Sequence, residues 1–489
     1  YLTSYKIRSL HVFWHNDTTI IIRDENPERK GMGAKQRIYT AGVLYYTVLK
    51  LRTDFRKERQ EDVMERNDPR YQAYVEILKE ELIPAMGCTE PIALAYAAAK
   101  AREVLGVLPD SVQLQVSGSI IKNVKSVIVP NTGHLKGMEA AVAAGIIAGS
   151  AEKELEVISE VSEEKKSAIR DYLQTVPITI EHTEQGHVFD IVVTERCGQD
   201  YARVRIADYH TNICRIEKNG TVLYEVPLLD ETVQEDARAD RSLLNMQDIW
   251  DFAETADLRD VADLLERQIR YNNAIAEEGL LGDYGANIGR VLLTTYGNDV
   301  SNRAKAKAAA GSDARMNGCE LPVIINSGSG NQGITCSVPL IEYAKELHSG
   351  KEKLYRALII SNLVAIHEKT GIGTLSAYCG AVSAGAGAGA GIVYLCGDGY
   401  QAAIHTVVNA LAIVSGIVCD GAKASCAAKI ASSVDAALLG YNMYKCNQEF
   451  KGGDGIVMKD IETTIKGIGR LGKDGMRQTN EEIIRLMMS

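Results

Sequence analysis

Hydrophobic and polar residues alternate from residue 111 to about residue 230, which is the pattern of half-buried β-strands. Val112, Leu114 and Val116 begin this alternation, and an Asn219-Gly220 pair predicts a hairpin turn near its end. The pattern predicts strands near 112–116, 124–129, 177–182, 188–196, 201–207 and 211–216, with helices at 137–150 and 152–172. We therefore expect a small α/β module at 111–235.

Beyond residue 235 the hydrophobic spacing is helical nearly to the end of the chain. The expected helices are 245–280, 283–310, 335–349, 352–366, 373–396, 400–418, 422–440 and 477–488. Glycine and alanine runs at 380–391 indicate that some of these helices pack very closely. The predicted fold class is α+β, in which a mostly helical bundle, made of 64–110 and 236–489, carries the inserted module at 111–235.

Residues 1–63 differ from the rest of the chain. They hold β-branched and aromatic patches around Trp14 and a charged run from Arg52 to Asp62, and nothing in them continues into the later pattern. Met64 would make a natural start, with a helix from Pro69 to Leu82 behind it. We expect 1–63 to be an appended extension or a mis-assigned start.

The composition and net charge of the chain exclude some classes of binding partner. The chain of 489 residues is 46% hydrophobic and 24% charged, with a formal net charge of −10, which argues against a nucleic acid or an anionic membrane as a partner. The apolar segment 402–419 approaches transmembrane length, but it contains His405 and Asn409 and has no basic flank, so a buried core helix is the better interpretation. No signal peptide opens the chain, and we expect a cytoplasmic protein.

Three of the ten cysteines form a pattern. Cys419 and Cys426 bracket a short turn, Asp420-Gly421-Ala422-Lys423-Ala424-Ser425, and Cys379-Gly380 precedes them by a helix-length apolar segment. Inside a cell, thiolates gathered in this way bind a metal or an iron–sulfur cluster more often than they form a disulfide. The remaining cysteines are irregularly spaced, and no zinc-ribbon or zincin motif is present.

A fourth cysteine lies just before a predicted helix. In Gly87-Cys88-Thr89-Glu90-Pro91, Thr89 is expected to be the N-cap and Gly106 to end the helix. A thiol placed ahead of a helix N-terminus is favoured as a thiolate by the helix dipole. The alternative is a small buried cysteine without chemistry.

A glycine-rich loop, Asn326-Ser327-Gly328-Ser329-Gly330-Asn331-Gln332-Gly333, lies between an apolar run and a helix. Its amides and the helix N-terminus predict an anion site, and the serines and Asn331 suit the carboxylate of an amino acid. It is not a P-loop, since no Gly-Lys-Ser/Thr follows, and a plain solvent turn is the alternative. Weaker candidates for the same cleft are Ser117, Ser119, Asn123, Asn131, His134, His367 and Lys369.

Together with Leu375-Ser376-Ala377-Tyr378-Cys379-Gly380, these motifs resemble the L-cysteine desulfidase family, which is related to the iron–sulfur L-serine dehydratases. The resemblance covers about 64–489. It implies a catalytic bundle with a [4Fe-4S] cluster held by Cys379, Cys419 and Cys426, and Cys88 left free as the proton acceptor. It also implies that the substrate contacts Thr89, Glu90, Ser327, Gly328, Ser329, Gly330, Asn331 and Gln332.

The implied reaction is β-elimination of L-cysteine to sulfide, pyruvate and ammonia, catalysed by a carbon–sulfur lyase. Serine dehydratases carry a similar cysteine trio but a serine-rich stretch with a histidine where this chain has Cys88-Thr89-Glu90, so cysteine is favoured over serine. Three alternatives stay open: an iron–sulfur L-serine dehydratase, a pyridoxal-phosphate lyase using the Ser-Gly-Asn loop, and a non-catalytic iron–sulfur or sulfur-binding protein. We expect a homo-oligomer with an amino-acid substrate.

Overall fold

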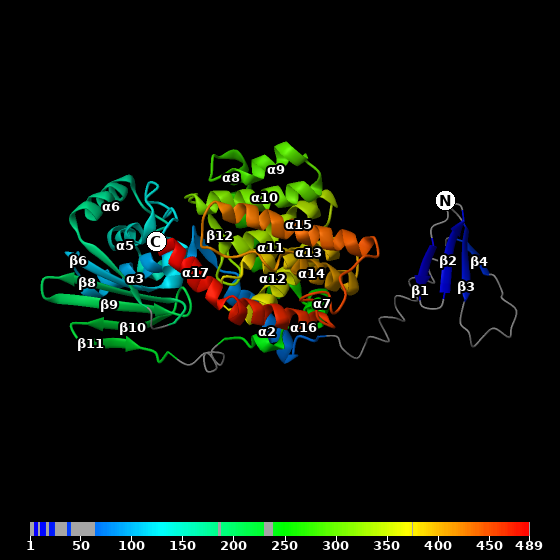
Figure 1. The fold of residues 1–489 in the computed structure, drawn as a ribbon, viewed down its shortest axis with the longest axis horizontal. Helices are drawn as coiled ribbons and strands as arrows, with labels where there is room; N and C mark the ends of the chain where they lie inside the picture. Colours follow the sequence, from blue (N-terminus) through cyan, green and yellow to red (C-terminus); the bar gives the residue numbers. More distant parts are fainter. Residues whose placement is uncertain are drawn as a thin grey trace. The chain divides into compact units, whose positions relative to one another are not determined.

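The computed structural model describes residues 64–183, 187–228, 238–373 and 375–488, together with four strands before residue 64. The chain divides into two compact units, Tyr1–Val63 and Met64–Ser489. In the first unit β1 (Ser4–Ile7), β2 (Leu10–His15), β3 (Thr19–Asp24) and β4 (Arg37–Thr40) form an antiparallel sheet in that order (Figure 1). The charged run at 52–62 lies outside the described residues, and the interpretation of 1–63 as an extension stays a prediction.

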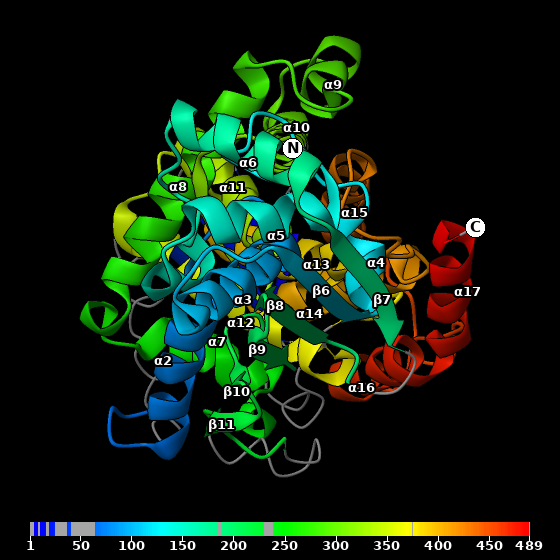
Figure 2. The same cartoon turned by 90° about the vertical axis from the view of Figure 1, so that its left-hand side faces the viewer.

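The α/β module is a six-stranded sheet in the order β11-β10-β9-β8-β6-β7. Its strands are β6 (Ser111–Ser117), β7 (Ile178–Thr183), β8 (Asp190–Cys197), β9 (Asp200–Ala207), β10 (Ile213–Lys218) and β11 (Thr221–Glu225). β7 runs parallel to β6, which needs a crossover, and α4 (Gly118–Val124), α5 (Gly137–Ala148) and α6 (Glu163–Thr175) supply it. Val112, Leu114 and Val116 are buried, as their alternation predicts, and α3 (Thr89–Leu105) packs against β8 and β9 (Figure 2).

Two local predictions in this module are wrong. The stretch 124–129 was expected to be a strand, but α4 ends at Val124 and the stretch makes only an isolated bridge at Ile128. The stretch 152–172 was expected to be one helix, but it holds a 3₁₀ turn, Ala151–Glu156, before α6. Ser162 starts α6 afresh by accepting a hydrogen bond from the Lys165 amide, which is ordinary N-cap chemistry.

The rest of the unit is a helical bundle, so the predicted α+β class is confirmed (Figure 1). Its helices are α2 (Pro69–Glu81), α7 (Met246–Thr255), α8 (Ala262–Leu281), α9 (Ile288–Tyr296), α10 (Val300–Met316), α11 (Gly330–Glu346), α12 (Lys351–Ile372), α13 (Gly380–Cys396), α14 (Tyr400–Val414), α15 (Ser425–Lys445), α16 (Ile461–Arg470) and α17 (Arg477–Met488). The predicted helices 245–280 and 283–310 are each split, at 256–261 and at 297–299. Asp257 and Asp299 accept hydrogen bonds from backbone amides there and so begin new helical segments. The sequence pattern did not predict α16.

The bundle is organised around α13. A Cβ atom at Gly385 would lie 2.8 Å from the Ser433 backbone of α15, and one at Gly391 would lie 2.8 Å from the Ala357 carbonyl of α12. The glycines therefore allow α12 and α15 to approach α13 more closely than side chains would permit, as the glycine and alanine runs predicted. Cys379, which precedes α13, is thereby held against its neighbours.

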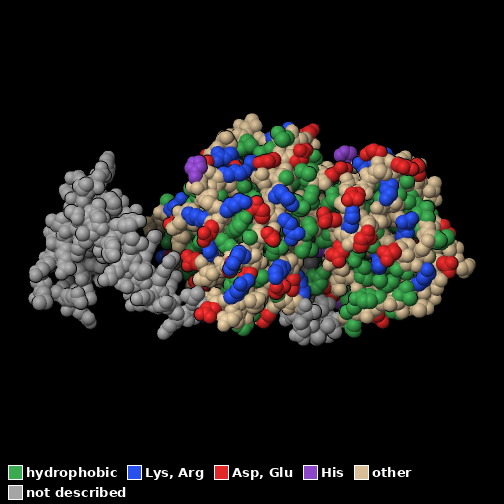
Figure 3. All heavy atoms as spheres, turned by 180° about the vertical axis from the view of Figure 1, so that it is seen from behind, with side chains coloured by type: hydrophobic (Ala, Val, Ile, Leu, Met, Phe, Trp, Pro, Cys, Tyr) green, Lys and Arg blue, Asp and Glu red, His purple; other side chains and the backbone are tan. Residues whose placement is uncertain are grey.

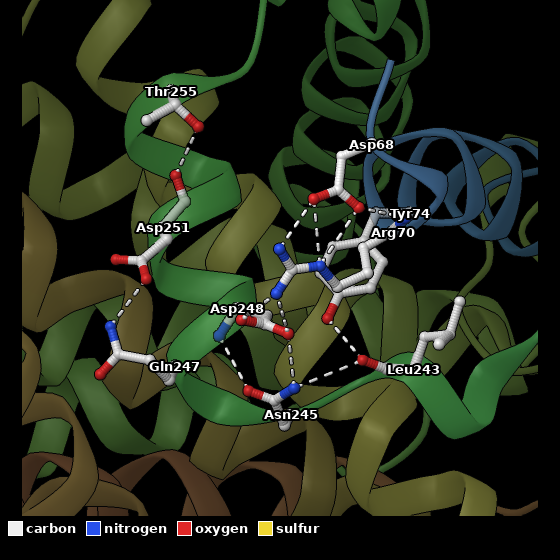
Figure 4. A network of polar contacts seen from close by, with 9 residues as sticks. All are labelled: Asp68, Arg70, Tyr74, Leu243, Asn245, Gln247, Asp248, Asp251 and Thr255. Atoms are coloured by element: carbon white, nitrogen blue, oxygen red, sulfur yellow. Dashed lines mark hydrogen bonds and ion pairs between the residues drawn. The ribbon is translucent and has the colours of Figure 1, made fainter. Parts of the chain in front are cut away.

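A polar network fastens α2 to α7 at the bottom of the bundle (Figure 4). Arg70 bonds its guanidinium to Asp68 at 2.7 Å and to Asp248 at 3.1 Å. Asn245 donates to Asp248 at 2.8 Å, and the Tyr74 hydroxyl donates to the Leu243 carbonyl at 2.8 Å. This network fixes the start of the second unit to α7.

Residues 402–414 of the apolar segment lie in α14, which packs inside the bundle as expected, whereas 415–419 lie outside the helix. His405 pairs with Glu449 at 2.6 Å, and Asn409 donates to the Gly440 carbonyl at 3.1 Å. Among the described helices, none combines the length and the apolar character that a membrane span requires.

On the face shown in Figure 3, acidic and basic side chains are interspersed.

Candidate functional site

The loops before α13 and α15 bring Cys379 and Cys419 side by side. The Cys379 amide donates to the Ile417 carbonyl at 3.1 Å, and the Cys419 amide donates to the Ala377 carbonyl at 2.6 Å. Cys379 is the N-cap of α13, and Cys426 lies in the first turn of α15. Two helix N-termini and one two-stranded bridge therefore position the three thiols.

The three thiols influence one another electrostatically. Burial raises the pKa of the Cys379 thiol, and Cys419 and then Cys426 raise it further. Burial likewise raises the pKa of the Cys426 thiol, with Cys419 adding to the effect. We call Cys379, Cys419 and Cys426 the cysteine nest. Burial of Cys379 and Cys426 favours their neutral thiols, so a cation or a positively charged group is needed to stabilise their thiolates.

Across the described ranges, no three His, Cys, Asp or Glu side chains converge as ligands of a single metal ion. A cluster makes a different demand, because each thiolate binds a different iron and the sulfurs need not meet at one point. The donor set of three thiols, two of them at helix N-termini, fits an iron–sulfur cluster better than one ion.

Two buried lysines lie beside the nest. Lys122 of α4 donates to Asn480 at 2.6 Å and to the Ser376 carbonyl at 3.4 Å. Burial lowers the pKa of Lys369 on α12 to about 8, while Cys419 and Cys379 oppose the change. Burial also lowers the pKa of Lys122, again against Cys419. These ammonium groups can balance the negative charge of a thiolate-bound cluster.

The first turn of α3 carries the fourth cysteine. Cys88 is 2% exposed and packs against Val127, Met316 and Cys426. Its thiol donates to Glu90 Oε2 at 3.2 Å. Cys88, rather than Thr89, is the N-cap residue, so that expectation is corrected, whereas Gly106 ends α3 in the left-handed region as predicted.

A thiolate was expected at Cys88 because of the helix N-terminus, but the surroundings of this residue disfavour its deprotonation. Burial raises the pKa of the Cys88 thiol well above its ordinary value, and the Glu90 carboxylate raises it further. Arg315 acts in the opposite direction. In this environment the resting group is therefore the thiol, hydrogen-bonded to a carboxylate that can accept its proton.

Glu90 connects α3 to the α/β module and Thr89 connects it to the glycine-rich loop. The Asn123 side chain of α4 donates to Glu90 Oε1 at 3.0 Å. The Thr89 hydroxyl lies 3.0 Å from the Gly328 carbonyl and donates to it. The Cys88-Thr89-Glu90 segment and the loop at 326–333 are therefore in direct contact.

The glycine-rich loop turns sharply before α11. Ser327 and Gly328 have φ values of 48° and 76°, and the Asn326 and Ser329 backbones bond to each other at 3.0 and 3.1 Å. Asn331 and Gln332 then fall in the first turn of α11. A Cβ atom at Gly380 would lie 2.6 Å from Gln332 Cδ, so this side chain lies directly against the residue after Cys379. The loop and the cysteine nest are contiguous.

Two residues of the site carry no recognisable sequence signal. Arg315, on α10, is 2% exposed, and a Cβ atom at Gly330 would overlap its guanidinium. His210, in the turn between β9 and β10, lies over Gly328, where a Cβ atom would be 3.1 Å from His210 Cε1. Burial lowers the pKa of His210, which is therefore a neutral imidazole near pH 7. An alanine-rich helix and an ordinary turn gave no reason to single them out.

Several weaker candidates have structural roles instead. Ser117 donates to the Val188 carbonyl at 2.7 Å, and Asn131 donates to the Ile158 carbonyl at 2.8 Å. His134 is exposed, and His367 pairs with Glu462 at 2.8 Å. Of the weaker set, Asn123 contacts Glu90, and Lys369 lies near the nest.

Comparisons with known proteins place the chain in a family. The serine dehydratase alpha-chain family matches residues 152–485, a span that contains Cys379, Cys419, Cys426 and the glycine-rich loop. A UPF0597 protein of Desulfitobacterium hafniense (strain Y51) is 61% identical over 426 residues, covering 87% of this chain and 99% of the relative. UPF0597 proteins of Lachnoclostridium phytofermentans and Treponema denticola are 52% and 47% identical, each over 86% of this chain and over 100% and 98% of the relatives.

These matches confirm the resemblance that the motifs indicated. The match of the family covers most of the chain, and the relatives match almost end to end. The chain belongs to the serine dehydratase alpha-chain family of iron–sulfur lyases.

Proposed function

We propose that this protein is an L-cysteine desulfidase that eliminates sulfide from L-cysteine and yields pyruvate and ammonia. One observation carries the proposal: the buried Cys88 thiol donates to the Glu90 carboxylate and belongs to a cluster against which Cys426 packs, while the adjacent Thr89 bonds the glycine-rich loop. A proton acceptor, a site for an amino acid and a place for a leaving sulfur are thus adjacent.

Cys379, Cys419 and Cys426 would hold the cluster, which we propose to be of the [4Fe-4S] type. With three thiolate ligands, such a cluster supplies an iron that lacks a protein ligand and can act as a Lewis acid toward the substrate sulfur. Lys122 and Lys369 contribute positive charge next to these thiolates. Cys88 remains outside the ligand set in this account.

The protein's own residues carry the proton. Glu90 accepts the proton of the Cys88 thiol through the hydrogen bond between them. The resulting thiolate takes the α-proton of the bound cysteine, the Cα electron pair forms the Cα–Cβ double bond, and the Cβ–S bond breaks to release sulfide. The aminoacrylate that remains adds water and loses ammonia to give pyruvate. No change of oxidation state occurs.

The loop side chains and amides orient the substrate. Ser327 and Ser329 flank Gly328, Asn331 and Gln332 follow in α11, and the helix N-terminus favours an anionic group there. Thr89 fixes the loop to the segment that carries Cys88. Holding the α-carbon beside Cys88 is the contribution expected of this arrangement.

L-Serine is the second candidate substrate, because the matched family is described as serine dehydratase. The same proton transfer, with hydroxide leaving in place of sulfide, would yield the same aminoacrylate. The thiol at position 88 distinguishes this chain from the histidine-containing stretch that serine dehydratases carry.

Parallel assays of anaerobically reconstituted protein with L-cysteine and L-serine test the proposal. We expect sulfide and pyruvate in equal amounts from cysteine, and a kcat/KM for cysteine well above that for serine. A higher kcat/KM for serine would assign the dehydratase reaction instead. A bound cluster with turnover of neither amino acid would assign a non-catalytic role.

A further inference from the structure

Arg315 is a buried cation whose Nε has no hydrogen-bond partner among the described residues. It is 2% exposed, and within the described ranges no side chain forms a hydrogen bond or an ion pair with it. Excluding an unpaired guanidinium from water costs several kcal/mol, so a fold tolerates it only where something anionic binds.

The guanidinium faces the start of α11. Gly330 is the first residue of that helix, and a Cβ atom there would lie 2.8 Å from Arg315 Cζ. The free amides at the beginning of a 17-residue helix and the Arg315 charge therefore act on the same small volume. Glycine at 330 is required because any side chain would fill that volume.

The surroundings of this volume are polar and incompletely bonded. The His210 ring lies against Gly328, and its Nε2 has no hydrogen-bond partner among the described residues. The Gln332 Oε1 atom, against Gly380, also has none. Three buried polar groups without partners around one loop indicate a missing polar ligand, since buried polar atoms are normally satisfied.

We infer that Arg315 binds the α-carboxylate of the substrate at the N-terminus of α11. The inference rests on the proposed function, in that it takes the ligand to be an α-amino acid. The planar guanidinium can bond both oxygens of a carboxylate, and it adds a full positive charge to the partial charge of the helix N-terminus. Arg315 thereby distinguishes amino acids from amines and thiols that lack the acid group.

An alternative partner for Arg315 is the Cys88 thiolate, on which it also acts. The two roles differ in what they predict for a substrate without a carboxylate. A carboxylate-binding arginine affects KM for the acid and leaves the ester unaffected. A counter-ion for Cys88 affects kcat for both.

Kinetics with L-cysteine and L-cysteine methyl ester separate these roles in the reconstituted wild type, Arg315→Gln and Arg315→Lys. We expect Arg315→Gln to raise KM for cysteine about 100-fold, as for loss of one partner of a buried charge pair, with Arg315→Lys intermediate. The ester should be a poor substrate whose kinetics do not change on substitution. Arg303→Gln, on the same helix α10 but paired with Glu346, is the matched control and should behave as wild type. An unchanged KM for cysteine in Arg315→Gln would overturn the inference, as would an equal loss with acid and ester.

Calorimetry with L-alanine and L-alaninamide decides the matter if the protein turns over no amino acid. L-Alanine keeps the carboxylate and has no leaving group, so its binding does not depend on turnover. We expect the wild-type holoprotein to bind L-alanine but not the amide, and Arg315→Gln to bind neither. This result would support Arg315 even if the proposed reaction failed. Without turnover, absence of L-alanine binding to the wild type, or its retention in Arg315→Gln, would overturn the inference.

Discussion

The Cys88 thiol donates a hydrogen bond to the Glu90 carboxylate across 3.2 Å, and both side chains are almost fully excluded from water. Glu90 is in turn held by Asn123, so the carboxylate cannot turn away from the thiol without losing a buried contact. This pair can move a proton between substrate and protein without bulk solvent.

Replacing Glu90 with glutamine should remove this proton acceptor while keeping the size of the side chain. We expect Glu90→Gln to lower kcat about 10²- to 10⁴-fold, the usual contribution of a general base, with iron content and KM near those of wild type. Glu103→Gln, on the exposed face of the same helix, is the control. A kcat equal to that of wild type in Glu90→Gln would show that Cys88 delivers its proton elsewhere.

The ligand assignment predicts iron content. Cys379→Ala, Cys419→Ala and Cys426→Ala should each lose most of the cluster after anaerobic reconstitution, measured as iron and sulfide per chain, where wild type should hold about four irons. Cys396→Ala, at the exposed end of α13, should retain it. Retention of a full cluster in Cys379→Ala would remove that residue from the ligand set.

The sequence could predict the chemistry of the site better than its geometry. Cysteines and glycines can be recognised in a sequence by their spacing and their preference for turns. Cys88, the three cysteines of the nest and the loop at 326–333 were therefore identified from local pattern. Arg315 and Lys122 could not be, because a buried cation looks like a solvated one until the elements packed around it are known. The same limit explains why 124–129 was expected to be a strand, since a short apolar run without its packing neighbours does not distinguish a strand from other buried backbone.

Close helix packing at α13 predicts a stability effect. Gly385→Ala would place a methyl group 2.8 Å from the Ser433 backbone and should destabilise the protein by about 1–3 kcal/mol, as overpacking usually does. Gly467→Ala, in the interior of α16 with its nearest atom 3.7 Å away, should instead stabilise by about 0.5–1 kcal/mol. Chemical denaturation measures both. Equal stabilities for the two variants would contradict the packing described for α13.

Glu368 predicts a pH dependence of stability. Its side chain is buried, and burial raises its pKa well above the ordinary value while the Ser383 hydroxyl acts in the opposite direction. The folded protein therefore holds this proton at a pH where the unfolded chain has released it. Glu368 therefore contributes its full stabilisation of the fold at pH values below its pKa in the unfolded chain. This stabilisation is lost, by about 1.4 kcal/mol per pH unit, as the pH rises toward its pKa in the folded protein.

Glu368→Gln should reduce this slope in the pH range above the ordinary glutamate pKa and make the variant more stable than wild type at the upper end of that range. Glu164→Gln, on the exposed face of α6, should leave the wild-type slope intact. The free energy of unfolding, measured by urea denaturation across this range, gives the comparison. A slope in Glu368→Gln as steep as in wild type would mean that Glu368 is ionised in the folded state.

The most direct measurement of the central claim is sulfide release from L-cysteine by the Cys88→Ala holoprotein, made beside its iron content. We predict a full complement of iron and a rate of sulfide release below about 1% of wild type, because the cluster ligands remain and the proton acceptor is gone. Full iron with a wild-type rate would show that another group removes the α-proton. Loss of the iron would make Cys88 a ligand of the cluster, and the proposed mechanism would then be wrong.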